Sequence, residues 1–276
     1  MSGFAMRYWK GSIALSSTRD YPLLRHVCQS GFVTHNQLFE LLKLDYCAPS
    51  RKAFNNRVLR LVRHGLLNRR GPLPASRDVV YSLSVLADSA LGVSQKPFTY
   101  STLNGGSNVS DRQLRHSLDL NEIHLALKRS GSLVYWMPET EVRSRNDLTQ
   151  YGYWKYYDAV VVVRIAGQNC KFALEYERTP KAARQYVAIR ERLDQETSIR
   201  QFLYLVPNHD LMWFLGEKLS QCRRAVYIGL LQDFLEQTLA VSVRRSGSPA
   251  TITLASVLSD GREPQKSGTL FPGSAV

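Results

Sequence analysis

The sequence predicts an α+β protein with two domains: a helical domain that ends in a β-hairpin, and a mixed α/β sheet domain. Three observations support this prediction. The chain has 276 residues, and at about 150 residues per domain this length favours two domains. Helix-capping signals dominate residues 18–93, whereas strands and helices alternate over residues 112–240. Residues 94–111 are polar and rich in glycine, serine and threonine, which indicates a linker.

The charge balance indicates a polyanionic partner. Lysine and arginine total 36 against 23 aspartate and glutamate residues, which gives a net charge of +13 and a pI of about 9.7. Residues 1–80 hold +9 of this excess, while residues 81–240 and 241–276 hold +2 each. A basic excess of this size suits nucleic acid or an acidic membrane surface. Its position indicates that the first domain makes the contact.

Several classes of protein are excluded. The sequence has no apolar run of about 18 residues that would span a bilayer, and residues 1–10 lack the apolar core of a signal peptide. The four cysteines lie far apart without a CxxC pair, which is typical of reduced thiols. No P-loop and no GxSxG motif is present. We therefore expect a cytoplasmic protein without a membrane partner.

Two helices open the first domain. Thr18–Asp20 and Pro22 begin the first helix, which stops at Gly31. Thr34 and Gln37 form the capping box of a second helix, because each side chain can bond the backbone of the other residue. Apolar residues recur at helical spacing in both segments, so each helix has one buried face.

A third helix carries the basic residues of this domain. Ser50 caps it, and it runs from Arg51 to His64 before Gly65. One face is an apolar stripe that we expect to be buried, and the opposite face bears polar and cationic side chains. The stripe consists of Phe54, Val58, Leu61 and Val62.

A hairpin and a short helix follow. Leu66–Arg70 and Val79–Leu83 are predicted strands, and Gly71–Pro74 between them makes a basic, proline-rich tip. Ser84 caps a fourth helix that reaches about Leu91. Three helices followed by a hairpin are the arrangement of a winged helix-turn-helix domain. In such a domain the third helix enters the major groove of DNA and the hairpin contacts the backbone.

This arrangement predicts roles for the exposed polar residues. Asn55 and Asn56 have the amide groups that pair bidentately with adenine, and Arg60 has the guanidinium group that pairs with guanine. Other cationic side chains suit phosphates, which supply affinity without sequence information. We therefore expect double-stranded DNA as the partner, bound without a cofactor; a solvated helix face or a protein-binding winged helix is the alternative. The predicted phosphate contacts are Arg51, Lys52, Arg63, Arg69 and Arg70.

The second domain has the element order α-β-β-β-α-β-α-β, which predicts a central sheet covered by helices. The expected elements are a helix over 112–130, strands at Leu133–Met137, Ala159–Ile165 and Lys171–Arg178, a helix from Thr179 to about Glu196, a strand at Phe202–Val206, a helix at Asp210–Gln221 and a strand at Ala225–Ile228. We expect a loop at residues 138–149, a turn at Gly167–Asn169, and a weakly structured tail at residues 241–276 with one strand at Thr251–Val257.

Acidic residues gather at one edge of the predicted sheet. Asp158 begins one strand, while Glu175 and Glu177 lie two residues apart on the next and therefore face the same side. Glu122 lies on the preceding helix. Such carboxylates suit Mg²⁺ or Mn²⁺, which would activate water for phosphodiester cleavage. In the alternative, Glu177 pairs with Lys181 or another basic residue of the following helix, and Asp158 caps its strand.

This order resembles the PD-(D/E)XK nuclease superfamily, in which a helical glutamate, an aspartate at a strand and Glu-x-Lys on the next strand precede a helix. The chain has Glu177 at the position of that lysine. The resemblance implies that Lys181 or Arg178 replaces the lysine and that Gln185 faces the same site. The catalytic residues it implies are Asp158, Glu175, Glu177, Lys181 and Gln185, and the metal ligands are Glu122, Asp158 and Glu175.

The combination of both domains resembles the replication-relaxation family, because a winged helix and a linker precede a domain with Leu174–Thr179 before a basic helix. The resemblance covers residues 20–235. It implies a sequence-specific double-stranded DNA-binding protein of a plasmid or mobile genetic element that acts in transcriptional regulation or in replication and mobilisation. A degenerate nuclease-like domain would serve dimerisation or partner contact, so a homodimer and replication or mobilisation proteins are expected. The alternatives are a Mg²⁺-dependent DNA nickase or endonuclease targeted by the winged helix, and an interaction protein that binds an acidic protein.

Two further features have competing explanations. His124 lies two residues after Glu122, but no zinc-ligand spacing surrounds it, so we expect an ordinary helix histidine. The aromatic run Tyr151–Tyr157, which includes Lys155, suits the stacking of single-stranded bases, with packing at a sheet edge as the alternative.

Overall fold

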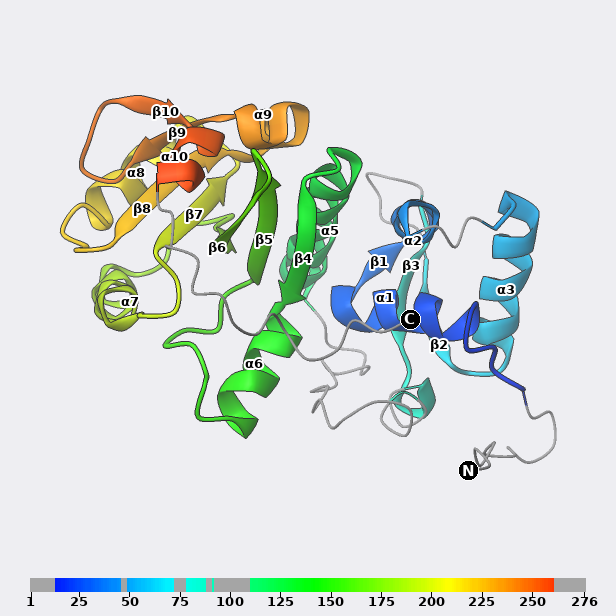
Figure 1. Cartoon of the computed structure of the whole chain (residues 1–276). Helices are drawn as coiled ribbons and strands as arrows, with labels where there is room; N and C mark the ends of the chain where they lie inside the picture. Colours follow the sequence, from blue (N-terminus) through cyan, green and yellow to red (C-terminus); the bar gives the residue numbers. More distant parts are fainter. Residues whose placement is uncertain (1–12, 46–48, 72–77, 88–90, 92–109, 261–276) are drawn as a thin grey trace.

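The computed structural model describes residues 13–45, 49–71, 78–87, 91 and 110–260. They form two units that lie side by side (Figure 1): an N-terminal unit with a three-stranded sheet, and a larger sheet unit with a seven-stranded sheet. The predicted mixed α+β class is therefore confirmed. Within these described ranges, no helix is long and apolar enough to cross a membrane.

The N-terminal unit contains the predicted helices and hairpin. Thr34 and Gln37 make both hydrogen bonds of the capping box, each 3.1 Å long, and Ser50 Oγ accepts a hydrogen bond from Ala53 N at 3.2 Å. The side chains of the predicted apolar stripe on the third helix are buried or half-buried in the core of this unit. The elements are α1 (Asp20–Ser30), β1 (Val33–Thr34), α2 (His35–Leu44), α3 (Arg51–Arg63), β2 (Leu67–Arg70) and β3 (Val80–Leu83).

The hairpin pairs β2 with β3 in antiparallel register, from Leu67 opposite Leu83 to Arg70 opposite Val80. β1 adds to the other edge of β3. Residues 72–74 of the predicted tip lie outside the described residues, as do residues 88–90 of the predicted helix after Ser84 and residues 94–109 of the predicted linker. The elements follow the order that a winged helix-turn-helix requires, and that assignment stays a prediction.

The sheet unit has the strand order β10-β9-β8-β7-β6-β5-β4, in which β6, β7 and β8 are parallel and the other neighbours antiparallel. Helices α5, α9 and α10 cover one face of the sheet, and α6, α7 and α8 cover the other. The elements are α5 (Asp111–Arg129), β4 (Leu133–Pro138), α6 (Glu139–Leu148), β5 (Ala159–Ile165), β6 (Gln168–Tyr176), α7 (Ala183–Gln195), β7 (Gln201–Val206), α8 (His209–Lys218), β8 (Ala225–Leu230), α9 (Leu231–Gln237), a 3₁₀ helix (Thr238–Ala240), β9 (Ser242–Arg245), β10 (Thr251–Thr253) and α10 (Leu254–Asp260).

Several predictions about this unit are wrong. We expected a loop over residues 138–149, but Glu139–Leu148 form α6. The helical pattern of this segment is weak because its buried residues are only Val142 and Ser144. Residues 242–260 are not weakly structured, because they pair two strands and pack α10 onto the sheet through apolar side chains. The predicted strand at Thr251–Val257 stops at Thr253, where α10 begins.

Helix α5 belongs to the cores of both units. Leu125 packs in the N-terminal core, whereas Ile123 and Leu127 pack under the sheet. Hydrogen bonds from two buried side chains cross between the units: Asn121 Nδ2 donates to the Phe32 carbonyl at 2.7 Å, and Gln37 Nε2 donates to the Leu118 carbonyl at 2.9 Å. The units are therefore joined by a packed helix, not only by the chain between them.

Candidate functional site

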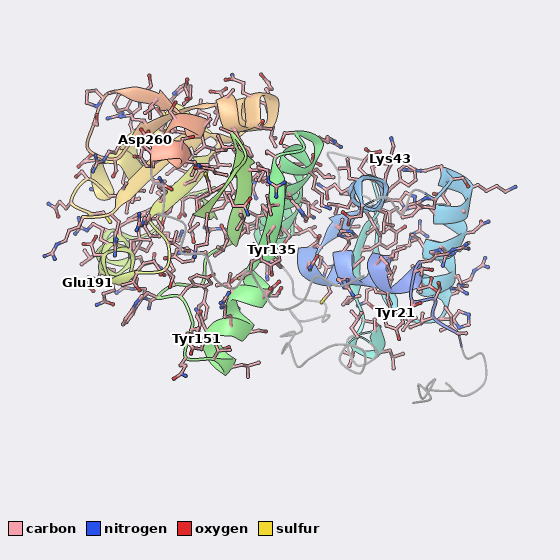
Figure 2. The ribbon with its side chains drawn as sticks, in the orientation of Figure 1. Tyr21, Lys43, Tyr135, Tyr151, Glu191 and Asp260 are labelled. Atoms are coloured by element: carbon pink, nitrogen blue, oxygen red, sulfur yellow. The ribbon has the colours of Figure 1, made fainter. Side chains whose placement is uncertain are left out.

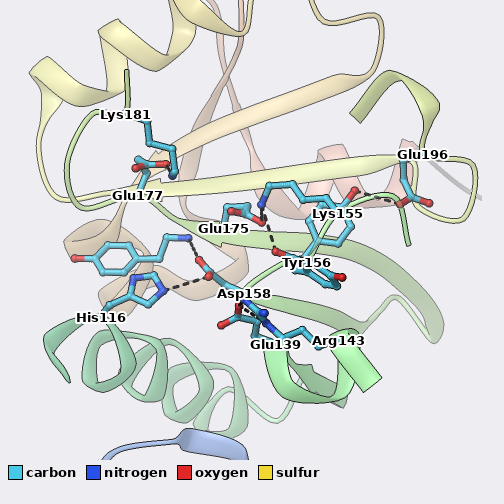
Figure 3. A network of polar contacts seen from close by, with 12 residues as sticks. His116, Glu139, Arg143, Lys155, Tyr156, Asp158, Glu175, Glu177, Lys181 and Glu196 are labelled. Atoms are coloured by element: carbon cyan, nitrogen blue, oxygen red, sulfur yellow. Dashed lines mark hydrogen bonds and ion pairs between the residues drawn. The ribbon is translucent and has the colours of Figure 1, made fainter. Parts of the chain in front are cut away.

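A charged cluster lies where β5 and β6 approach α5 and the start of α7 (Figure 3). The antiparallel pair β5–β6 places Ala159 opposite Leu174, so Asp158 lies beside Glu175. Glu177 directly follows β6, and three cationic residues come from other segments. The charged cluster consists of His116, Lys155, Asp158, Glu175, Glu177 and Lys181.

Asp158 is held by two donors. His116 Nε2 lies 3.2 Å from Asp158 Oδ1, and Tyr176 N donates to Asp158 Oδ2 at 2.7 Å. Burial opposes ionisation of Asp158, but the hydrogen bond and charge of His116 outweigh it and lower the pKa of this carboxyl. Burial likewise opposes protonation of His116, yet Asp158 raises the pKa of the imidazole. The pair is therefore stabilised as carboxylate and imidazolium.

Glu175 behaves differently from its neighbour. Burial raises the pKa of Glu175 to about 7, and the negative charge of Asp158 acts in the same direction, while Lys155 opposes both. The Lys155 ammonium contacts Glu175 Oε1 and lies 3.5 Å from the Tyr156 carbonyl oxygen. Two adjacent carboxyl groups thus have pKa values that are shifted in opposite directions.

Glu177 is an ion-pair partner. Its carboxylate contacts Lys181 Nζ, and its backbone N–H donates to the Leu205 carbonyl at 2.9 Å. Burial lowers the pKa of Lys181. This pairing is the one that the alternative explanation for Glu177 predicts, and it brings Lys181 into the charged cluster.

Two predicted site residues lie elsewhere. Glu122 Oε1 accepts a hydrogen bond from Gln37 Nε2 at 2.7 Å, because its face of α5 meets α2 of the N-terminal unit. Gln185 Oε1 accepts a hydrogen bond from Ala182 N at 2.9 Å, so this side chain caps the start of α7. Neither residue belongs to the charged cluster, and the predicted roles of Glu122 as a metal ligand and of Gln185 as a site residue are corrected accordingly.

The predicted metal site does not fit the side chains as they lie. Asp158, Glu175 and Glu177 each already have a cationic partner. In the described part of the chain, no group of three or more histidine, cysteine, aspartate or glutamate side chains is arranged to hold a metal ion. We therefore derive no metal-dependent step from this arrangement.

A second candidate site is the exposed face of α3, on the side of the molecule away from the sheet unit (Figures 1 and 2). Lys52, Asn56 and Arg63 are exposed there, and neither cation makes an ion pair within the described residues. Asn55 Oδ1 lies 3.0 Å from His35 Nε2. Arg51 donates to Asn36 Oδ1 at 2.5 Å, which orients its guanidinium group.

The predicted guanine contact, Arg60, has a structural partner. Arg60 and Arg57 each donate to the carboxylate of Asp20 at 2.7 Å, and Asp20 is completely buried at the start of α1. A buried carboxylate needs such partners, so this pair ties α3 to α1. On the hairpin, Arg69 is exposed, whereas the Arg70 guanidinium lies 5.6 Å from the centroid of the Phe32 ring.

Sequence reasoning missed the roles of His116 and Lys155. Lys155 lies three residues before Asp158, but its aromatic neighbours suggested base stacking or edge-strand packing. The edge-strand alternative is wrong, because the segment is a loop with Tyr151 and Trp154 exposed by 72% and 55%. The stacking of single-stranded bases stays a prediction. His124 is confirmed as a buried helix histidine that stacks on Trp136 with ring centroids 4.5 Å apart, and burial lowers its pKa to about 3.

The profile of the replication-relaxation family matches residues 24–195, more than half of the sequence. The chain belongs to the replication-relaxation family. No curated protein matches this replication-relaxation protein. Among solved structures, it is similar to the restriction endonuclease FokI bound to DNA, with 11% identity over 78% of this chain and a TM-score of 0.26. The chain spans 43% of that structure, and a likeness this low carries no argument about function.

Proposed function

We propose that this replication-relaxation protein binds double-stranded DNA and reads its site with α3. The observation that carries the proposal is a continuous exposed stripe on this helix. At helical spacing, Lys52, Asn56, Leu59 and Arg63 lie on one face. The two cations suit phosphates, the amide suits adenine, and an exposed leucine suits a thymine methyl group.

The neighbouring residues support this orientation. Arg51 and Asn55 are held against α2 by hydrogen bonds to Asn36 and His35, so their polar groups are preorganised at the edge of the stripe. Arg69 is exposed on β2 of the hairpin and supplies a further phosphate contact. The +9 charge of residues 1–80 adds long-range attraction to the same polyanion.

The biological role follows from the family and the two-unit architecture. We infer that the protein serves a plasmid or mobile element in transcriptional regulation or in replication and mobilisation. The N-terminal unit reads the DNA, and the sheet unit provides dimerisation or a contact with replication or mobilisation proteins. The internally paired charges of the sheet unit support this division, because the cations of the charged cluster are already engaged by carboxylates.

Salt-dependent DNA binding tests the proposal. Fluorescence anisotropy with DNA from the native locus is compared for the wild type and for Lys52→Ala with Arg63→Ala. Affinity should fall by at least about tenfold, and the slope of log K against log salt should shrink by about two, because two phosphate contacts are lost. The matched control removes two exposed cations of the sheet unit, Arg192→Ala with Arg223→Ala. An equal loss of DNA affinity in both double variants would contradict the proposal that α3 contacts the DNA.

The same DNA tests sequence reading and cleavage. Asn56→Ala should lower affinity for the native site while leaving weak binding to unrelated DNA unchanged, whereas equal loss on both would remove this residue from base recognition. When the wild-type protein is incubated with supercoiled DNA and Mg²⁺ or Mn²⁺, the mobility of the DNA should fall without nicking. The reason is that the carboxylates of the charged cluster are already paired with cationic side chains. Nicking by the wild type that is lost in Glu175→Ala would support the nickase alternative instead.

A further inference from the structure

We propose that Lys155 is a built-in counter-ion that occupies the cation position of the Asp158–Glu175 pair, so that this pair takes no divalent ion while Lys155 is in place. The inference concerns the sheet unit alone and does not depend on DNA binding by α3. It assigns a function to a residue in the middle of the aromatic loop. It also gives a physical reason why the predicted metal site does not form.

The loop around Lys155 is fixed on both sides. Tyr153 N donates to Asn146 Oδ1 at 2.6 Å, and Trp154 N donates to Glu196 Oε2 at 3.1 Å. Tyr157 is fully buried, and its hydroxyl lies 3.2 Å from the same oxygen of the buried Glu196. These contacts direct alternate side chains inward, and Lys155 is one of them, with its side chain 13% exposed. Its position is therefore set by the backbone of the loop.

The Lys155 ammonium has the surroundings of a bound cation. It contacts Glu175 Oε1, lies 3.5 Å from the Tyr156 carbonyl oxygen and lies 5.3 Å from the centroid of the Tyr157 ring. Its positive charge also acts on Asp158, whose pKa it helps to lower. Carboxylate and carbonyl oxygens are the ligands that hard divalent cations prefer, so the ammonium group uses atoms that a metal ion would need.

The charge balance of the cluster leads to the same conclusion. Three cations (His116, Lys155 and Lys181) face three carboxylates (Asp158, Glu175 and Glu177). A divalent ion added to this set would meet the buried ammonium at close range, where like charges repel strongly. Removing only the ammonium would leave a buried carboxylate without its partner, which is costly unless a proton or another cation replaces it. A neutral side chain at position 155 should therefore create a divalent-cation site.

Manganese binding tests this inference. Lys155→Met keeps the length of the side chain and its packing but removes the charge. At pH 8, free Mn²⁺ is followed by electron paramagnetic resonance during titration of the wild type, Lys155→Met and the double variant Lys155→Met with Glu175→Gln. We expect no specific binding by the wild type, one Mn²⁺ bound by Lys155→Met, and loss of that binding in the double variant. Lys155→Arg, which keeps a positive charge, should behave as the wild type.

Thermal unfolding gives an independent readout. Millimolar MnCl₂ should raise the Tm of Lys155→Met by several degrees and leave that of the wild type unchanged, since a ligand stabilises the state that binds it. A Lys155→Met chain that folds only when Mn²⁺ is present would also support the proposal. Specific Mn²⁺ binding by the wild type, a folded Lys155→Met chain without such binding, or one that stays unfolded with Mn²⁺ would each overturn it. DNA affinity measured in EDTA reports separately on α3.

Discussion

Asp158 and Glu175 show how the surroundings of single residues separate two chemically similar groups. Burial acts on both carboxyls, but His116 lowers the pKa of Asp158 below its ordinary value, while the pKa of Glu175 rises to about 7. Near neutral pH one carboxyl is ionised and the other is partly protonated, a division of roles that is typical of functional sites. Lys155 opposes the rise in the pKa of Glu175.

The raised pKa of Glu175 predicts that stability falls as pH rises. The ordinary pKa of the carboxyl, 4.5, applies to the unfolded chain, so the folded chain binds this proton more tightly. The resulting stabilisation is complete below pH 4.5 and is lost as pH rises through about 7. The raised pKa of His116 acts in the same direction above its ordinary value of 6.5. Between about pH 5 and pH 8, the titration of Glu175 should lower the free energy of unfolding, measured in urea, by at most about 3 kcal/mol.

Glu175→Gln should flatten this dependence, because the amide does not titrate, while the exposed carboxyl of Glu191 provides the control variant Glu191→Gln. An equally steep dependence in Glu175→Gln would show that another group causes it.

At the scale of single elements, the sequence predicted the features that neighbouring residues determine, such as helix caps and the faces of a strand. The starts of α2 and α3 follow the side-chain caps Thr34 and Ser50, and α1 ends at Gly31. The shared side of Glu175 and Glu177 follows the two-residue period of a strand. By contrast, α6 has too few buried residues for a visible pattern. His116 and Lys155 reach the cluster from α5 and a loop, and no sequence spacing encodes that meeting because tertiary packing produces it.

The β5–β6 turn lies one residue earlier in the chain than the sequence predicted. The turn was predicted at Gly167–Asn169, but Ile165 pairs with Gln168, so Ala166 and Gly167 form a two-residue turn. Both have positive φ, 48° and 80°, which is favourable for asparagine or glycine and unfavourable for alanine. Ala166→Asn should therefore raise the free energy of unfolding by about 0.5–1 kcal/mol, and Gly167→Ala should lower it by about 1 kcal/mol, as measured in urea. Stability changes of the same sign in both variants would contradict this account of the turn.

At the scale of the whole molecule, α5 makes the two units depend on each other. Its residues enter both apolar cores, and its polar side chains satisfy groups of the N-terminal unit. Lys128 of α5 contacts Asp45, which also lies 2.5 Å from His26. Burial opposes ionisation of Asp45, but these two partners lower its pKa to about 2. The exposed face of α3 on one unit is thus held in position relative to the sheet of the other unit.

This coupling predicts that both units unfold together. In a Trp9→Phe background the remaining tryptophans, Trp136, Trp154 and Trp213, all lie in the sheet unit, so their emission reports on that unit alone. Amide hydrogen exchange of α3 reports on the N-terminal unit. The two midpoints in urea should coincide. Asn121→Ala should lower the free energy of unfolding that both probes report by about 1–3 kcal/mol, because it leaves the Phe32 carbonyl without its buried donor.

The exposed Asn169 provides the matched control, since Asn169→Ala should change stability by less than about 0.5 kcal/mol. Separate midpoints, or an Asn121→Ala effect confined to tryptophan emission, would mean that α5 stabilises the sheet unit without coupling it to the N-terminal unit. Orientation of α3 by the sheet unit would then require bound DNA or a second copy of the chain.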